Sequence, residues 1–389
     1  MADMQNVLQA ANSLFREGNY VQARELYVKA QALYPELEFI AQSISHCDRL
    51  LGKGAQAKGL QQQSAVTQTF VPVGTQMSVS ARQTSIAFYR IIGNSIDVLH
   101  GENQALENLR FQLEHESQSP LVQKNWVLNR IVDRSQQSEI EGLLKSYGAK
   151  YTKIPFDLSL FNDLVSLFAV NEKEVQGLGL AQRVRYLSAK SALLNSYVMN
   201  NNGARNFSLV SGRRRADWVL PFDGNIFINK INFDRMLAFL SEGRHPGLAY
   251  TCPMFRCDTN AIDALEQVDS GDEEPQILFG AMAGMLFDER FVYGRRPKVE
   301  MLWRLGAKGP WDSFVDDVFD PERNAIRLNH LYGGHAFNVV RLSTGGDDSS
   351  VASAKKRNSV RTEGVVRFFA GLSENYRAKA NLICPELSF

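Results

Sequence analysis

The chain has 389 residues, of which 44% are hydrophobic and 22% charged, and its formal net charge is +1 at neutral pH. These values are typical of a globular protein with one to three domains, and the balanced charge argues against a broad basic surface for nucleic acid or anionic membrane. The four cysteines are too scattered for a disulfide framework, so we expect a reducing compartment. We expect neither a signal peptide nor a transmembrane segment. The predicted location is cytoplasmic, including the inner face of the membrane.

The first 52 residues are expected to be helical. Small and aromatic residues such as Ala11, Ala23 and Tyr27 follow a spacing that resembles one tetratricopeptide repeat, and a plain helical hairpin is the alternative. One repeat cannot bury its own face, so residues 1–52 are predicted to bind a partner protein or to self-associate. Residues 53–83 lose any apolar period and are interpreted as a linker.

Residues 84–389 are predicted to form an α/β domain. Strands are expected at 86–92, 125–132 and 151–155, with helices between them at 104–116 and 137–147. This alternation predicts a parallel sheet with right-handed connections. Ligands of such sheets bind beyond the carboxyl ends of the strands.

Polar residues follow the first two of these strands. Arg90, Asn94 and Asp97 come at the first strand end, and Arg130 and Asp133 at the second. Such residues can hold a base and a ribose, although each of them alone is more commonly a turn former. We therefore predict the nucleotide half of a pocket at this edge of the sheet.

A helix predicted at 193–212 follows an amphipathic helical segment at 158–192. Asn202, Arg205 and Asn206 lie at helical spacing on one face of it. An arginine fork suits phosphate oxygens and the amides suit hydroxyls, whereas a solvated helix face is the alternative. Because this helix leads directly into the next strand, we predict that it contributes to the same pocket.

The most distinctive stretch is an apolar strand at 216–222 that ends in Asp223, followed by Gly224 and Asn225. A single carboxylate on a strand end, beside a glycine that lets a ligand approach, suits Mg²⁺ or Mn²⁺ and a bound phosphate. The alternative is a turn, for which Asp-Gly is a common pair.

The later part of the chain holds candidates for a general base and a further metal ligand. Glu274 and Asp288 stand among several carboxylates, and either can accept a proton from an acceptor hydroxyl. Glu274 also precedes Pro275 and an expected helix start, which makes capping an alternative role. His335 lies in a predicted Gly-Gly-His loop before a predicted strand. It is either a metal ligand or a structural histidine. A surface loop is expected at 344–358, and a strand or helix at 361–376.

Several common motifs are absent from the sequence. It has no Walker-type phosphate loop, no Gly-x-Gly-x2-Gly after the first strand, no Gly-x-Ser-x-Gly elbow and no His-Glu-x2-His. The sequence therefore gives no support for a hydrolase, a kinase or a dinucleotide oxidoreductase.

Residues 84–376 resemble the GT-A type of nucleotide-sugar glycosyltransferases, particularly family-two-like enzymes. The resemblance rests on the layout, on Asn-x2-Ala-Arg-Asn at 201–206, and on Asp-Gly-Asn at 223–225, where that family has Asp-x-Asp. A tetratricopeptide-like hairpin before a bacterial glycosyltransferase domain is also a familiar arrangement. The resemblance implies a Rossmann-like mixed sheet flanked by helices.

The resemblance also implies a reaction and a set of roles. A sugar would pass from a nucleoside diphosphate sugar to a hydroxyl of a glycan, lipid-linked or protein acceptor, as in polysaccharide biosynthesis. By this resemblance, Mg²⁺ or Mn²⁺ would be bound by Asp223, Asn225 and His335. Arg205 would bind the diphosphate or the donor sugar, and Asn94, Asp97 and Asp133 would bind the nucleotide. Glu274 or Asp288 would act as the base. The alternatives are a sugar-phosphate or nucleotidyl transferase, and an inactive scaffold that binds partners through its helical segment.

Overall fold

The computed structural model describes most of the chain from Thr84 to Ile383. It leaves out residues 97–100, 102, 169–171, 243–244, 246, 258, 267–270, 272, 314–319 and 344–353, and near the start it describes residues 11, 14, 19–33, 44, 47, 48 and 51. The chain divides into two compact units, Met1–Val79 and Ser80–Phe389. The linker predicted at 53–83 lies outside the described residues. None of the helices in the described part is long and apolar enough to cross a membrane.

The first unit is helical where it is described. Helix α2 spans Tyr20–Leu33, and its Ala23 and Tyr27 are buried against Ala11 and Cys47. Small side chains allow this close approach, and the tyrosine ring fills the space between the packed segments. The helical character is as expected, and the assignment to tetratricopeptide repeats stays a prediction.

The second unit contains a mixed sheet, which in the described part has nine strands. The strands are β1 (Ile86–Ile92), β2 (Val122–Asn129), β3 (Lys150–Ile154), β4 (Trp218–Asp223), β5 (Ile226–Phe227), β6 (Ala249–Arg256), β7 (Glu273–Gly280), β8 (Tyr332–His335) and β9 (Val339–Arg341). Their order is β3-β2-β1-β4-β7-β6-β9-β5, with β8 also paired to β6. Strands β1 to β4 are mutually parallel, whereas β7 runs antiparallel to both β4 and β6. Strand β7 is therefore a single reversed strand between β4 and β6, and β8 and β9 pair in parallel with β6.

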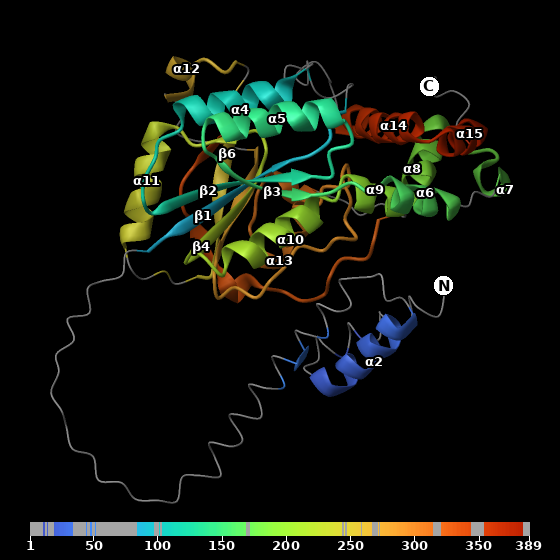
Figure 1. The fold of residues 1–389 in the computed structure, drawn as a ribbon, viewed down its shortest axis with the longest axis horizontal. Coiled ribbons are helices and arrows are strands. Elements are labelled where there is room, and N and C mark those ends of the chain that lie inside the picture. The colour runs from blue at the N-terminus through green and yellow to red at the C-terminus, as the bar shows by residue number, and fades with distance from the viewer. Residues whose placement is uncertain are drawn as a thin grey trace, which may run out of the picture. The chain divides into compact units, whose positions relative to one another are not determined.

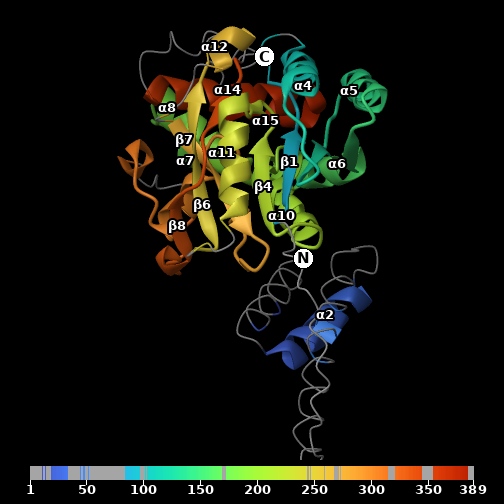
Figure 2. The same cartoon turned by 90° about the vertical axis from the view of Figure 1, so that its left-hand side faces the viewer.

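Helices cover both faces of the sheet (Figure 1). Helices α4 (Gln104–His115), α5 (Arg134–Ser146) and α11 (Lys230–Ser241) lie on one face, and α10 (Asn201–Gly212) and α13 (Val299–Leu305) on the other. The alternation of strand side chains explains this, because Phe88 and Leu220 face the first layer while Tyr89 and Val219 face the second. Full burial of each such side chain contributes roughly 1.5–3 kcal/mol. Figure 2 shows α11 lying along the sheet.

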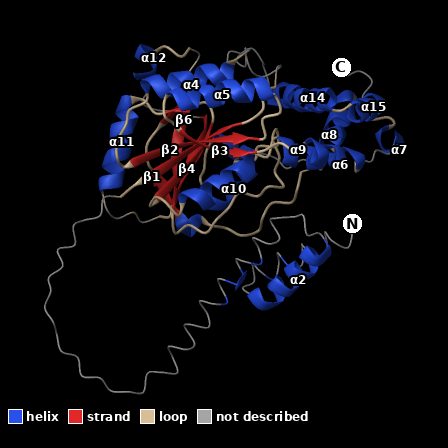
Figure 3. Cartoon of the chain, viewed as in Figure 1, coloured by secondary structure: helices blue, strands red, loops and turns tan. Residues whose placement is uncertain are grey.

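A separate helical cluster lies beside one end of the sheet (Figure 3). It combines α6 (Leu158–Ser166), α7 (Glu172–Val175), α8 (Leu180–Lys190) and α9 (Ala192–Val198) with the C-terminal helices α14 (Ala354–Leu372) and α15 (Glu374–Ile383). Phe161, Phe369 and Tyr376 are fully buried at its centre. Short elements complete the unit: α12 (Ile262–Glu266) and the 3-10 turns η1 (Pro310–Ser313) and η2 (Asn329–Leu331).

The predicted α/β class with a mixed, helix-flanked sheet is confirmed. Four local expectations are wrong. Helix α14 begins at Ala354, inside the surface loop expected at 344–358, of which residues 344–353 lie outside the described part of the chain. His335, expected in a loop, ends strand β8. The helix predicted at 193–212 is broken, because Asn200 adopts a left-handed conformation (φ 34°) and caps α10 by accepting a hydrogen bond from the Gly203 N–H. The helix start expected after Glu274 is instead strand β7, so that residue caps no helix. The segment at 361–376, left open between strand and helix, is helical.

Candidate functional site

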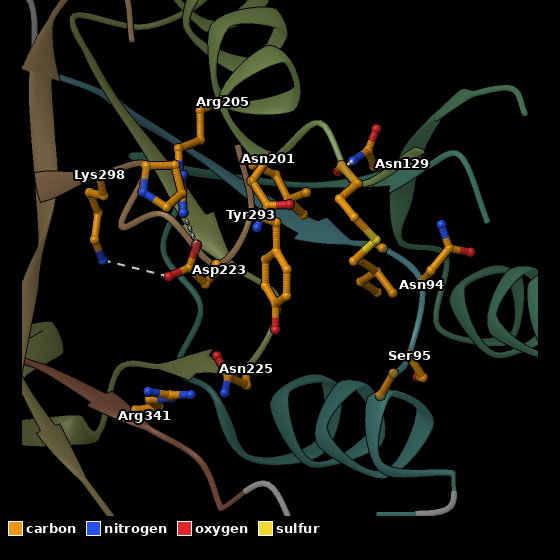
Figure 4. Close-up of a pocket in the computed structure, with 18 of the residues that line it drawn as sticks. Asn94, Ser95, Asn129, Asn201, Arg205, Asp223, Asn225, Tyr293, Lys298 and Arg341 are labelled. Atoms are coloured by element: carbon orange, nitrogen blue, oxygen red, sulfur yellow. Dashed lines mark hydrogen bonds and ion pairs between the residues drawn. The ribbon is translucent and has the colours of Figure 1, made fainter. Parts of the chain in front are cut away.

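A cavity of about 310 Å³ opens at the carboxyl ends of β1 and β4. The end of β1, the start of α10, the turn after β4, the strands β6, β7 and β9, and the segment 293–298 all contribute to its lining. Figure 4 shows Asn94 and Ser95 on one side of the cavity, Lys298 and Arg341 on the other, and Asp223 between them. The cavity thus lies at the edge where parallel sheets bind ligands.

Asp223 ends β4 and is the carboxylate at the centre of this cavity. Its Oδ1 accepts a hydrogen bond from Arg205 Nη2 at 2.7 Å, and its Oδ2 accepts one from Gln276 Nε2 at 3.1 Å. Lys298 Nζ lies 3.6 Å from Oδ2. Burial alone would raise the pKa of Asp223, but the charges of Arg205 and Lys298, with the hydrogen bonds from Arg205 and Gln276, hold that pKa well below its usual range. Asp223 is therefore ionised and paired with two cations.

Arg205 reaches Asp223 from helix α10, as the helical spacing predicted. Its side chain is nearly fully buried, its Nη1 donates to Asn202 Oδ1 at 2.8 Å, and its guanidinium lies 5.5 Å from the centre of the Phe287 ring. These contacts fix the orientation of the guanidinium fork. Arg205 also lines the cavity, together with Asn201 from the first turn of the same helix.

Asn202 and Asn206 lie outside the cavity lining and bind the backbone of the neighbouring 286–298 segment. The Asn202 amide donates to the carbonyl oxygens of Asp288 (2.8 Å) and Pro297 (2.9 Å), and the Asn206 amide donates to that of Phe287 (3.0 Å). Neither side chain is part of the cavity lining. Both residues therefore attach helix α10 to the 286–298 segment, which carries five cavity residues: Tyr293, Gly294, Arg296, Pro297 and Lys298.

Lys298 links the two halves of the site. Its side chain is only 5% exposed, and its Nζ lies 3.5 Å from Glu274 Oε1 as well as 3.6 Å from Asp223 Oδ2. Burying an ammonium group is unfavourable unless carboxylates compensate it, and here two of them do. The lysine is thus held between the carboxylate of β4 and a carboxylate of the antiparallel part of the sheet.

Strands β6, β7 and β9 supply further charged groups. Glu273 pairs with Arg256 at 2.7 Å and with Arg341 of β9 at 3.4 Å. Glu273, Glu274 and Arg341 all line the cavity. Glu274 is the one of the two predicted base candidates that reaches it. Asp288 does not line the cavity, and its carboxylate forms a two-pronged ion pair with Arg290.

The opposite side of the cavity is built from amides and backbone. The Asn94 amide donates to the Arg130 carbonyl at 2.8 Å, and its Oδ1 accepts from the Val132 N–H at 2.8 Å. Asn129 donates to the Met199 carbonyl at 2.7 Å. Both asparagines line the cavity while they join the ends of β1, β2 and α9 to each other. This side is uncharged and lies among main-chain groups, which suits a nucleoside better than a phosphate.

The turn after Asp223 packs against the end of β1 and is hydrogen-bonded by Gln112 and Arg90. A Cβ atom on Gly224 would lie 2.6 Å from the Ile91 carbonyl oxygen, so this position accepts only glycine without a backbone shift. The glycine is thus needed for the approach of β1, and it also lines the cavity. Gln112 of α4 donates to the carbonyls of Gly224 (2.7 Å) and Ile226 (3.0 Å), and Arg90 donates to that of Ile226 (3.1 Å).

The remaining predicted residues lie outside the cavity lining. Arg90 is fully buried and pairs with Glu116. Arg130 places its guanidinium 5.0 Å from the Tyr197 ring centre, and Asp133 caps α5 by accepting from the Ser135 and Gln136 N–H groups. His335 shares a hydrogen bond with Thr251 Oγ1 at 2.7 Å on β6. Asp97 lies outside the described residues.

The predicted metal ligands can be tested against this geometry. Asp223 and Asn225 line the cavity, and His335 does not. Both oxygens of Asp223 already accept hydrogen bonds. Each of the two cations would repel a divalent ion about 5 Å away by roughly 7 kcal/mol at an effective dielectric constant of about 20, which offsets much of the ion's attraction to the Asp223 carboxylate. Within the described part of the chain, no three His, Cys, Asp or Glu side chains gather into a metal-binding group. The donor set therefore fits a resident Mg²⁺ or Mn²⁺ poorly.

Several cavity residues were not singled out from the sequence. They include Asn129, Tyr293, Arg296, Lys298, Arg341 and Arg361. The segment 293–313 shows a visible excess of basic groups, which was a usable signal for Arg296 and Lys298. No sequence signal pairs Lys298 with Asp223, because the contact depends on how the 286–298 segment folds back on α10.

Comparisons with known proteins add little to this site. No protein-family model matches the sequence, and no curated protein matches it. Among solved structures, the fold is similar to the apo form of mouse xyloside xylosyltransferase 1, with 9% sequence identity, coverage of 72% of this chain and 81% of that chain, and a TM-score of 0.22. At that TM-score we base no conclusion on the likeness.

Proposed function

We propose that this chain is a GT-A type glycosyltransferase that moves a sugar from a nucleoside diphosphate sugar to a hydroxyl acceptor. The observation that carries the proposal is a basic cavity at the carboxyl ends of β1 and β4. Five basic side chains line it against three acidic ones, so it has an excess of two positive charges. Arginine and lysine bind phosphate oxygens strongly in such enclosed positions.

The two sides of the cavity suggest where each part of the donor lies. The nucleoside fits the uncharged side formed by Asn94, Ser95 and Gln104. The diphosphate then lies against Arg205 and Lys298, near Asp223. The sugar and the acceptor lie toward β7, where Glu274 lines the cavity.

In the proposed transfer, the acceptor oxygen forms a bond to the anomeric carbon of the sugar. The bond between that carbon and the phosphate oxygen breaks, and its electron pair leaves with the nucleoside diphosphate. The proton of the acceptor hydroxyl passes to Glu274 in an inverting reaction. Arg205 and Lys298 stabilise the charge that develops on the departing diphosphate.

Residues 1–52 are proposed to mediate contact with a partner protein or with a second copy of the chain. Tyr27 is buried with Ala11, Ala23 and Cys47 in the described residues of this segment. That packing, together with the resemblance to a tetratricopeptide repeat, supports a docking role. Deleting residues 1–52 should change the molar mass measured by light scattering and leave nucleotide affinity unchanged. An unchanged mass, together with no loss of any captured partner, would contradict the docking role.

The proposed reaction can be tested by binding and by product analysis. Isothermal calorimetry of the full chain with uridine, guanosine, adenosine, cytidine and thymidine diphosphates, with Mn²⁺ and with EDTA, should show selective binding of one nucleotide. The matching nucleotide sugars should then release nucleoside diphosphate. If none of the five binds under either condition, the proposal fails. Release of nucleoside monophosphate or pyrophosphate would indicate a sugar-phosphate or nucleotidyl transferase instead.

A further inference from the structure

We propose that protein cations, chiefly Lys298 with Arg205, neutralise the donor diphosphate, and that donor binding needs no divalent metal ion. This inference rests on the proposed function and specifies how that same site recognises its substrate. It concerns the position that the sequence assigned to a metal, where Asp-Gly-Asn stands at 223–225.

The first observation is the position of Lys298. Its ammonium group is buried, yet it belongs to the cavity lining and lies within 3.6 Å of carboxylate oxygens of both Asp223 and Glu274. Arg205 approaches Asp223 from a different element (Figure 4). Two fixed cations beside one carboxylate occupy the region in which a metal would bind that carboxylate and the phosphates.

The second observation is the charge balance of the cavity. Its lining has five basic residues (Arg205, Arg296, Lys298, Arg341 and Arg361) and three acidic ones (Asp223, Glu273 and Glu274). A nucleoside diphosphate sugar carries about two negative charges, one on each phosphate. The excess of two positive charges in the lining therefore matches the donor without a metal, whereas a divalent ion would leave an uncompensated charge of about two.

The third observation is that the surrounding structure fixes these groups in place. Arg205 is held by Asn202, and Asn202 also holds the backbone at Pro297, next to Lys298. Gln276 donates to the remaining oxygen of Asp223. Asp223 thus acts as a positioning residue that orients two cations, and donor binding replaces part of this pairing by contacts with phosphate oxygens.

Calorimetry with the nucleoside diphosphate selected above tests this inference. In EDTA the wild-type affinity should be within about threefold of that in Mn²⁺. Lys298→Gln should weaken binding about 10- to 100-fold, the loss expected for a charge-assisted contact. Lys298→Arg should restore much of it, and Lys308→Gln, an exposed lysine outside the cavity, should change nothing.

Asp223→Asn separates the two possibilities for the motif. If Asp223 orients cations, this variant should still bind the nucleotide in EDTA, at an affinity within about tenfold of wild type, while sugar transfer falls. If it binds a metal, binding should require Mn²⁺ in the wild type and disappear in the variant. The second outcome overturns the inference but leaves the glycosyltransferase proposal standing. Thermal melts of all variants identify any that fail to fold, and Lys298→Arg then serves as the informative substitution.

Discussion

The two ends of the sheet contribute differently to the cavity. We call the end formed by β1 and β2 the parallel side, and the end around β7, which runs antiparallel to both of its neighbours, the antiparallel side. On the parallel side, Asn94 and Asn129 line the cavity with amides that are already hydrogen-bonded to neighbouring backbone. On the antiparallel side, Glu274 of β7 and the nearby Arg341 bring charges into the cavity. The parallel side thus provides a hydrogen-bonded surface of amides, and the ionic groups come from the antiparallel side, the 286–298 segment and the pair of Arg205 with Asp223 between the two sides. A polar residue at a strand end is therefore as well suited to holding the fold together as to binding a ligand.

The largest effect is expected at the proposed base on the antiparallel side. Glu274→Gln keeps the size of the side chain but cannot accept the proton, so turnover should fall about 100- to 10,000-fold. Nucleotide affinity, measured by calorimetry, should change little. Asp288→Asn is the matched control, because its carboxylate pairs with Arg290 outside the cavity. A larger loss of turnover in Asp288→Asn than in Glu274→Gln would exchange the two roles.

The next effect concerns the boundary between the two parts, at the Asp-Gly-Asn turn. Gly224→Ala places a methyl group 2.6 Å from a main-chain oxygen of β1, and relief of that contact should cost about 1–3 kcal/mol of unfolding free energy. Gly142→Ala in helix α5 meets no atom within 4 Å and should stabilise the protein by roughly 0.5–1 kcal/mol. Urea denaturation of both variants measures the contrast. Equal stabilities would show that β1 does not approach the turn as described.

A smaller effect is expected where helix α10 holds the 286–298 segment. Asn202→Ala removes the amide that donates to two part-buried carbonyls and accepts from Arg205. The loss should be roughly 1–3 kcal/mol, and hydrogen exchange should accelerate over residues 286–298. Because the segment carries Lys298, nucleotide affinity should fall in parallel. Unchanged exchange in that segment would indicate that other contacts hold it.

The smallest effect is expected on the parallel side, at Asp133. Asp133→Ala removes the cap of α5 and should cost about 1 kcal/mol of stability. Nucleotide affinity should stay the same, because Asp133 is not part of the cavity lining. A clear loss of affinity with no loss of stability would return Asp133 to the nucleotide-binding role that the sequence suggested.

The sequence predicted the parallel part of the fold well and the antiparallel part poorly. Buried apolar runs bounded by turn residues identify β1 and β4 directly, since their signal is local. Strand β7 begins with two glutamates. Charged residues are uncommon in buried strands, so the sequence alone does not indicate a strand here; the pairing with β6 establishes it. Among site residues, Asp223, Arg205 and Glu274 followed from local pattern. Lys298 and Arg341 did not, because they reach the cavity through contacts with residues far away in the sequence.

Arg90, which is fully buried outside the cavity lining, limits which substitutions this protein can accept in evolution. Its guanidinium lies among the rings of Phe88, Trp126 and Phe222 and pairs with Glu116, which also pairs with Lys124 at 2.9 Å. Loss of one of these charges leaves its partners buried and unpaired in an apolar interior, which lowers the stability of the fold. Replacing all three with apolar residues of similar volume can leave the stability unchanged. Descendants of this sequence should therefore keep the three charges or lose them together.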